Sequence, residues 1–165
     1  LNMTSQTWLT KNDWYHTRNR YTPANVWWHH LLIIIPDDLR ADSTRSVMYV
    51  GSGSNDRELV ADPLPSNGRL CASLAVSLRL VCSVVFQVPN QPLYFRDEAP
   101  EPPRRNEDGM IAYTWEHFRQ HPEEPEWVAQ LPQTKSVVRA MDAVTEYVSQ
   151  RTHAHPRVAG GRETI

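Results

Sequence analysis

Cysteine is scarce in this sequence, and neither sign of charge is in clear excess. The two cysteines, Cys71 and Cys82, are too few for a multi-disulfide scaffold or a four-cysteine zinc site, and they leave the cellular compartment open. Seventeen Lys and Arg residues against nineteen Asp and Glu residues give a formal net charge of −2. Because nucleic acids and anionic membranes recruit strongly basic surfaces, we expect neither of these partners.

A long uncharged segment is also missing. The best candidate covers residues 70–88, where Arg79 is the single charge, and an arginine at the centre of a bilayer costs about 2.5 to 3.5 kcal/mol. The first half has apolar residues at helical spacings of three and four, at Cys71, Leu74, Ala75 and Leu78. The second half is a β-branched and aromatic run that stops at Pro89. We therefore predict a helix over 70–80, a strand over 81–88 and no membrane span.

The residues that are abundant indicate a packed chain. Hydrophobic residues make up 40% of the 165 residues, and six Trp, six Tyr and three Phe are too many for a disordered tail. Apolar runs predict strands over 26–35 and 46–50, and a shorter run before a glycine turn predicts another over 157–160. Asn106 is a suitable cap for a helix that Pro122 closes.

Two helices have a recognisable apolar face. The strongest covers about 136–151, with its stripe at Val137, Met141, Val144 and Val148 and with Ala140 and Tyr147 beside it. The helix after Asn106 has an expected apolar face at Ile111, Trp115 and Phe118. Strands that alternate with helices predict a three-layer, mostly parallel α/β sheet with right-handed crossovers. We expect a single domain over residues 1–165, with a Pro-rich insertion at about 89–105 of a kind that often lies over a site.

A glycine-containing loop follows the second of these strands, with the residues Gly51, Ser52, Gly53, Ser54 and Asn55. Its backbone N–H groups are suited to a phosphate or a developing oxyanion. A dinucleotide fingerprint would need a third glycine where Asp56 stands, and the Gly-Lys-Ser/Thr ending of a phosphate loop is missing. Pro63 and Pro65 follow where a nucleophile elbow would need an immediate helix. By themselves, Ser52 and Ser54 are best interpreted as turn residues.

Seven histidines raise the question of a metal site. His29 and His30 are neighbours on a predicted strand, so their side chains point to opposite faces and cannot share one ion. His153 and His155 could share a face, but no third ligand is in evidence. The simpler interpretation is a packed strand histidine and a solvated loop. We expect no metal and no cofactor.

The tryptophans and the paired carboxylates also have structural interpretations. The tryptophans, which could stack on a ligand, are expected to pack in the core. Helix capping and solvation account for Asp37–Asp38, Glu107–Asp108 and Glu123–Glu124, which stand in loops or at helix starts. Asp142 is expected to pair with Arg139 rather than to act as a general acid or base.

Several longer motifs resemble a known family. They occur in order as Ser5-Gln6-Thr7-Trp8, Val26-Trp27-Trp28-His29, Val88-Pro89-Asn90-Gln91-Pro92, Glu107 to Trp115 (EDGMIAYTW) and Lys135 to Ala143 (KSVVRAMDA). This series resembles the PhoPQ-activated pathogenicity-related family, which includes secreted autocrine proliferation repressors. The resemblance covers nearly the whole chain.

The resemblance implies an α/β-hydrolase-like fold in an exported protein two to three times this length, of which this chain is the amino-terminal part. In the family, the last strand leads into a turn resembling Gly-Ala-Ser-Lys-Arg-Gly-Trp, with the serine at the nucleophile elbow. The matching position here is Arg162, whose guanidinium stays protonated and cannot attack a carbonyl. The loop at 51–55 would then be the remnant of an oxyanion loop.

We therefore interpret the chain as a truncated, catalytically inactive hydrolase-like protein. Full-length relatives resemble serine hydrolases, so acyl hydrolysis belongs to them. One alternative is a secreted, non-catalytic regulator of cell proliferation with a protein or receptor partner. Another is a fragment without a function of its own. A glycosylation sequon at Asn2 is a weak indication of export, although no signal peptide is visible from Leu1 onward.

Overall fold

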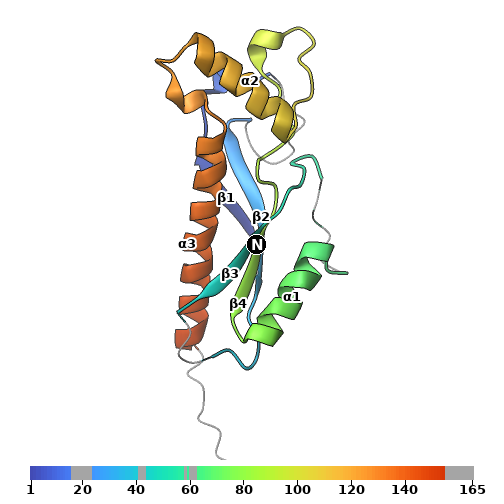
Figure 1. The fold of residues 1–165 in the computed structure, drawn as a ribbon, viewed down its shortest axis with the longest axis vertical. Coiled ribbons are helices and arrows are strands. Elements are labelled where there is room, and N and C mark those ends of the chain that lie inside the picture. The colour runs from blue at the N-terminus through green and yellow to red at the C-terminus, as the bar shows by residue number, and fades with distance from the viewer. Residues whose placement is uncertain (16–23, 41–43, 58, 60–62, 155–165) are drawn as a thin grey trace, which may run out of the picture.

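One sheet with the strand order β1-β2-β4-β3 organises the part of the chain that the structure describes (Figure 1). This computed structural model describes residues 1–15, 24–40, 44–57, 59 and 63–154. The strands are β1 (Asn2–Thr7), β2 (Val26–Ile34), β3 (Ser46–Val50) and β4 (Val81–Val85). The predicted strand over 157–160 lies outside the described residues.

The sheet is mixed, so the prediction of a mostly parallel sheet is wrong. Strand β1 pairs with β2 and β2 pairs with β4 in antiparallel fashion, whereas β3 and β4 are parallel. A parallel pair needs a crossover of a dozen or more residues, usually with a helix. Among the described strands only β3 and β4 are joined through a helix, and the strand β1, which has no apolar alternation, was not predicted at all. Strand β2 runs antiparallel to both of its neighbours, β1 and β4.

Helices α1 (Ser66–Leu78) and α3 (Gln130–Ala154) cover opposite faces of the sheet (Figure 1). Successive side chains of β4 point to opposite faces. Val81 and Val85 pack with Ala140 and Val144 of α3, and the alternate positions of β4 pack with α1. The expected three layers are confirmed.

Helix α1 begins and ends earlier than the predicted 70–80. Pro65 precedes its first turn, and Arg79 caps its end in the left-handed conformation with φ 56°. A disulfide joins Cys71 of α1 to Cys82 of β4, with the two Cα atoms 5.5 Å apart. Within the described residues no helix has the length and apolar character needed to cross a bilayer.

The two predicted apolar faces are partly wrong. In α3, Ala140 and Val144 are buried, whereas the side chain of Met141 is 50% exposed. Helix α2 (Glu107–Gln120) buries Met110 and Thr114, and its Trp115 is 48% exposed. The reason is that α2 lies beyond one end of the sheet and packs on an aromatic cluster instead (Figure 1).

This aromatic cluster is a second core at the end of the sheet. It consists of Trp8, Trp14, Trp27, Leu93, Phe95, Met110, Trp127 and Ala129. Five of the six tryptophans are buried, which confirms core packing for them and contradicts it for Trp115. The Pro-rich segment 89–105 contributes the fully buried Leu93 and Phe95, so these two residues fill the core. Short 3₁₀ helices at Lys11–Asp13, Arg96–Glu98 and Pro125–Trp127 complete this end.

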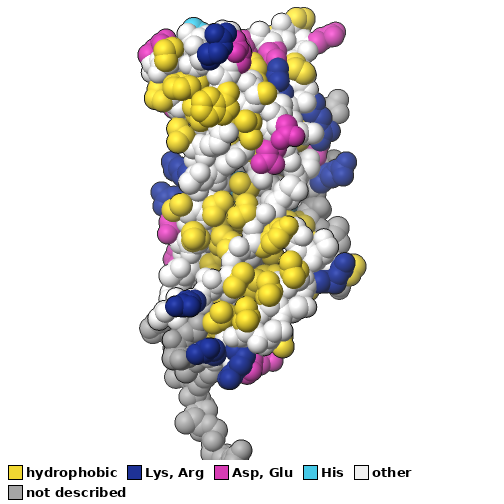
Figure 2. Space-filling view, viewed as in Figure 1, with side chains coloured by type: hydrophobic (Ala, Val, Ile, Leu, Met, Phe, Trp, Pro, Cys, Tyr) yellow, Lys and Arg dark blue, Asp and Glu magenta, His cyan; other side chains and the backbone are white. Residues whose placement is uncertain are grey.

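Apolar side chains also reach the surface of the sheet and its helices. Figure 2 shows them gathered in the middle of one face, over the region where β3 and α1 lie in Figure 1. The large exposed residues include Tyr49 and Val50 of β3 and Val76 of α1. Strand β3 is an edge strand, since it pairs with β4 alone in the described sheet.

Candidate functional site

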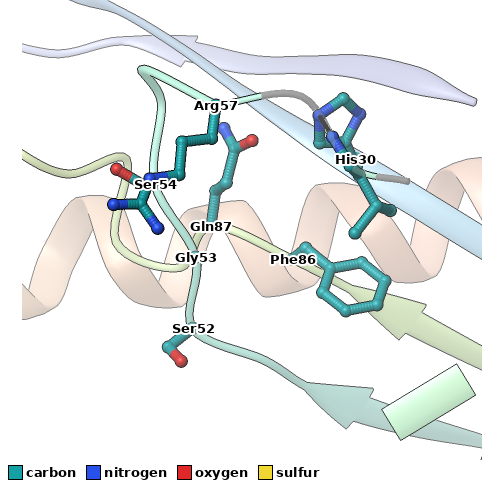
Figure 3. Close-up of a pocket in the computed structure, with 8 residues that line it drawn as sticks. His30, Ser52, Gly53, Ser54, Arg57, Phe86 and Gln87 are labelled. Carbon is teal, nitrogen blue, oxygen red and sulfur yellow. Dashed lines mark hydrogen bonds between the residues drawn. The ribbon is translucent and has the colours of Figure 1, made fainter. Parts of the chain in front are cut away.

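A small cavity opens where the parallel strands β3 and β4 end. Its volume is about 150 Å³, and it is lined by His30, Ser52, Gly53, Ser54, Arg57, Leu59, Phe86 and Gln87 (Figure 3). The carboxyl ends of strands are where open α/β sheets usually bind their ligands. Three residues of the loop predicted as a candidate site are therefore at a cavity wall.

The 51–55 loop is held at both of its ends by the last residue of β4 and the segment that follows it. The N–H of Gly51 donates to the carbonyl oxygen of Val85 at 2.8 Å, and the N–H of Val88 donates back to Gly51 at 3.2 Å. At the other end, the buried Asn55 side chain donates to the carbonyl oxygens of Asn90 and Pro92, both at 3.1 Å. The loop is thus a fixed part of the sheet's end.

Gln91 connects this loop to helix α2. Its Nε2 donates to the carbonyl oxygen of Gly53 at 3.0 Å, and its Oε1 accepts the backbone N–H of Glu107 at 2.6 Å. Glu107 is the first residue of α2, where helical N–H groups have no partner within the helix. The Gln91 amide therefore gives the first N–H group of α2 a hydrogen-bond partner and also holds the middle of the 51–55 loop.

Gly53 packs closely against Gln87. A Cβ atom there would lie 3.0 Å from Cγ and 3.1 Å from the backbone nitrogen of Gln87. Gln87 itself has a φ of 62°, a left-handed conformation that is uncommon for a residue with a side chain. Backbone in this region is often found at functional sites, where the surrounding packing holds it.

The middle of the loop has hydrogen-bond donors to spare. Within the described part of the chain, the backbone N–H groups of residues 52–54 make no hydrogen bond. The Ser54 hydroxyl is occupied, because it donates to the carboxylate of Asp56. Asp56 in turn lies 3.6 Å from the guanidinium of Arg104. A run of free backbone donors beside a cavity is what an anion-binding loop needs.

His29 and His30 lie as predicted, on opposite faces of β2. The His30 ring lines the cavity, and its Nε2 accepts the N–H of Leu59 at 3.3 Å. Its Nδ1 then carries the hydrogen and donates to Oδ1 of Asn2 at 2.8 Å. Asn2, the residue of the glycosylation sequon, is exposed on β1.

His29 is the packed strand histidine that the sequence predicts, and it is fully buried. Its Nδ1 faces the carbonyl oxygens of Gln87 at 2.8 Å and Phe86 at 3.2 Å, so this nitrogen bears the hydrogen. Its Nε2 accepts from the hydroxyl of Ser5 at 2.9 Å. Burial lowers the pKa of His29 to about 4, so the ring is neutral at pH 7.

Several other carboxylates that the sequence analysis considered form ion pairs in the described part of the chain. No group of three metal-ligating side chains occurs among the described residues. Asp38 pairs with Arg79 at 2.8 Å, and Glu124 with His117 at 2.8 Å. Asp142 pairs with Arg139 at 3.6 Å on the exposed side of α3, as predicted. Arg162 and His155 lie outside the described residues.

Among the cavity residues that were not predicted, Gln87 and Arg57 carry polar side chains that the sequence analysis did not consider. Gln87 was treated only as part of a strand, because nothing in the sequence signals a residue with positive φ immediately after β4. Arg57 stands two residues after the glycine loop, and the sequence does not show that its side chain turns back to that loop (Figure 3). A polar residue at the end of a buried strand was the signal available for Gln87.

With this geometry in view, the comparisons with known proteins identify the family. The sequence matches the PhoPQ-activated pathogenicity-related protein family over residues 1–161. The chain belongs to this family. It is also 36% identical over 155 residues to the autocrine proliferation repressor protein A of Dictyostelium discoideum, a match that covers 89% of this chain.

The match covers 26% of that relative, so the chain spans about a quarter of the length of the curated family member that it resembles. No solved structure shows significant similarity to the chain. Two of the motifs that carry the resemblance to this family lie next to the 51–55 loop or are connected to it. The motif 88–92 accepts hydrogen bonds from the Asn55 side chain of the 51–55 loop. The motif that starts at Glu107 begins helix α2, and the Gln91 side chain accepts the N–H of Glu107.

Proposed function

We propose that this chain is the amino-terminal part of an exported α/β-hydrolase-like protein and that its 51–55 loop is of the oxyanion-binding type. The observation that carries the proposal is the place of the loop. It lies between β3 and the first helix after it, α1, and the N–H groups of residues 52–54 have no partner in the described part of the chain. Hydrolases of this fold take one oxyanion-hole N–H from the corresponding loop.

The chain itself is proposed to hydrolyse no acyl substrate. The resemblance assigns the nucleophile to position 162, and an arginine stands there. The two serines at the cavity are poor substitutes. The Ser54 hydroxyl donates to Asp56, and Ser52 has no hydrogen-bonded base among the described residues that could activate it.

An esterase assay tests this part of the proposal. The purified chain is expected to hydrolyse p-nitrophenyl acetate no faster than the same chain after denaturation, and a fluorophosphonate probe is expected to label no serine. Saturable turnover together with labelling of Ser52 or Ser54 would contradict it. The Ser52→Ala and Ser54→Ala variants are the matched controls, since a residual rate that they leave unchanged is background.

A second candidate function is a non-catalytic regulator of proliferation. The observation that favours it is the 36% identity to a protein named autocrine proliferation repressor. Purified chain added to growing Dictyostelium discoideum cells is expected to lower the rate of cell division, and heat-denatured chain is the control. Equal growth in both cultures would favour the third interpretation, a fragment with no activity of its own.

Export is supported by two features of the structure. The disulfide between Cys71 and Cys82 is of a type that persists in oxidising compartments, and Asn2 of the sequon is exposed. When the chain is expressed in eukaryotic cells behind a secretion leader, we expect a glycan on Asn2. Endoglycosidase treatment should then increase the gel mobility of the chain and leave an Asn2→Gln variant unchanged. Secreted chain with no mobility change would argue against modification at Asn2.

A further inference from the structure

The face that carries the free edge of β3 exposes apolar side chains from all three layers of the fold. Tyr49 and Val50 of β3 and Met141 of α3 have exposed side chains. Leu70 and Leu78 of α1 are also exposed, and because they are two steps of four residues apart they lie on the same side of the helix. Figure 2 shows apolar side chains gathered on one face over these elements. These five residues are called the open face below, and exposed apolar surface of this kind marks an interaction site.

The backbone of β3 offers hydrogen bonds on the same side. The N–H of Gly51 donates to the carbonyl oxygen of Val85, and its carbonyl oxygen accepts the N–H of Val88, so both groups of Gly51 point toward β4. Backbone groups of successive strand residues point to alternate sides of the strand. The N–H and C=O groups of Met48 and Val50 therefore point away from β4, and they have no strand to pair with in the described sheet.

The parallel pairing of β3 indicates what kind of element would complete this edge. Parallel strands occur almost only in sheets that are covered on both faces, and α1 and α3 cover the two faces here (Figure 1). A strand added to β3 would bury its own side chains between further helices, which would in turn cover the exposed leucines of α1 and Met141 of α3. The open face thus has the composition of a three-layer fold that continues.

The handedness of crossovers decides which edge of the sheet the chain after α3 would reach. From β3 through α1 to β4, the chain moves from the free edge inward, over one face of the sheet. Helix α3 comes after β4 and lies on the opposite face (Figure 1). Because crossovers between parallel strands are right-handed, a change of face reverses the direction of movement. A parallel strand reached through α3 therefore lies beyond β3 and not beyond β1.

The end of α3 is also close to this edge. Val148, in the last turns of α3, and Met48 of β3 pack against the same hydrophobic cluster. The relative from Dictyostelium discoideum is matched over 26% of its length, so a family member has ample further chain to cover the open face.

We propose that the open face is the docking surface for the polypeptide that follows α3 in a family-length protein, and that a parallel strand on β3 is its central contact. The inference rests on the proposed function only in taking this chain as the amino-terminal part of a longer protein. It concerns neither the 51–55 loop nor ester hydrolysis.

A single-chain fusion tests the occupant. It consists of this chain followed by the residues of the Dictyostelium discoideum relative that lie beyond the match. Hydrogen exchange at the Met48 and Val50 amides is expected to be at least about tenfold slower in the fusion than in this chain alone at high dilution. The amides of β1, at the other edge of the sheet, should exchange equally in both. Equal exchange at Met48 and Val50 in the two proteins would overturn the proposal.

A matched pair of variants assigns the contact to the open face. In the fusion, Val50→Lys should lower the urea midpoint, because the charge would be buried, whereas in this chain alone the same exposed residue should leave the midpoint unchanged. Gln120→Lys adds the same charge at an exposed position at the end of α2 and should have no effect in either protein. A fusion that is indifferent to Val50→Lys would contradict the docking surface.

Co-expression of the two parts as separate chains gives an independent readout. They should purify together as a one-to-one complex, and Val50→Lys should prevent its formation while Gln120→Lys does not. Recovery of this chain as a homodimer that Val50→Lys dissociates, without the second part, would assign the open face to a second copy and overturn the proposal. Esterase activity of the fusion with an uncovered β3 edge would do the same, whereas a covered edge without esterase activity leaves the inference in place.

Discussion

A neutral histidine in the core links the stability of the fold to pH. His29 gives its Nδ1 hydrogen to the carbonyl oxygens after β4 and receives the Ser5 hydroxyl at Nε2. The Ser5 hydroxyl also lies 3.2 Å from that of Ser136, so the network joins β1, β2 and α3. Protonation would place an uncompensated charge in this buried network.

Stability should therefore fall on acidification. The pKa of His29 is lowered from 6.5 to about 4, so the unfolded chain binds the proton more tightly than the folded chain does. The contribution is complete above pH 6.5 and is lost as the pH falls from 6.5 to 4. We expect about 3 kcal/mol of unfolding free energy to disappear over this range, measured from urea unfolding at each pH.

The variant His29→Gln should flatten this pH dependence while lowering stability at pH 7. The same substitution at His121, which is half-exposed on its side chain, is the control and should leave the pH dependence in place. A His29→Gln protein with the pH dependence of the parent would show that other groups cause it.

Gly53 is expected to tolerate a side chain poorly. The Gly53→Ala change puts a methyl group against the backbone of Gln87, and we expect a loss of about 1 to 3 kcal/mol in the free energy of unfolding. Gly109 is the matched control, because a Cβ there has its nearest neighbours at 3.9 Å and the residue lies within α2. Gly109→Ala should be neutral or stabilising by up to about 1 kcal/mol. Thermal melts that shift equally in both variants would contradict the close packing.

At the scale of secondary structure, the disulfide ties α1 to the strand that it covers. Cys71 and Cys82 are 11 residues apart, and both are buried. Closing a loop of this length in the unfolded chain is worth about 3 kcal/mol in the chain-entropy description. Reductant should therefore lower the urea midpoint of the parent and leave that of a Cys71→Ala, Cys82→Ala double variant unchanged. An unchanged midpoint in the parent would mean that the cysteines are not joined.

The elements that could be predicted from the sequence are those with a strong local pattern. Strand β2 was predicted to within one residue and β3 without error, since each is a run of apolar residues that ends at a turn. Strand β1, with the sequence NMTSQT, has no such pattern and is specified by its pairing with β2. The face of α2 was misplaced because its partner is a cluster of aromatic residues from distant segments, which helical periodicity cannot reveal.

The candidate site could be predicted only in part. The 51–55 loop is marked by its two glycines and its place after a strand. Gln87 and Arg57 depend on how the chain turns after β4 and after the loop, and this follows from contacts such as that between Gly53 and Gln87. The disulfide was not predicted for the same reason, because two cysteines in a sequence do not show that their Cα atoms come within 5.5 Å.

For the whole molecule, the exposed edge of the sheet is the feature with the clearest consequence. Strand β3 pairs on one side only in the described sheet, and its Val50 is 46% exposed. Unpaired, apolar edge strands are templates for association. The apolar residues of α1 beside it enlarge the patch (Figure 2).

The isolated chain should therefore self-associate, and a charge on this edge should reduce the effect. We expect sedimentation velocity to show a concentration-dependent increase in mass, and Val50→Lys to diminish it. Thr145→Lys adds the same charge at an exposed polar position of α3 and should leave association unchanged. A parent chain that remains monomeric over the concentration series would contradict this prediction.

The Gln91 side-chain amide connects the 51–55 loop to the first N–H group of helix α2. The Gln91 side chain binds both the carbonyl oxygen of Gly53 and the N–H of Glu107. When one of these two hydrogen bonds breaks, the side chain is less restrained and the other hydrogen bond is weakened. Hydrogen exchange at the first amide of α2 thus reads out the opening of a loop some fifty residues earlier in the chain. A ligand that steadies residues 52–54 would slow the exchange of a proton that it never touches.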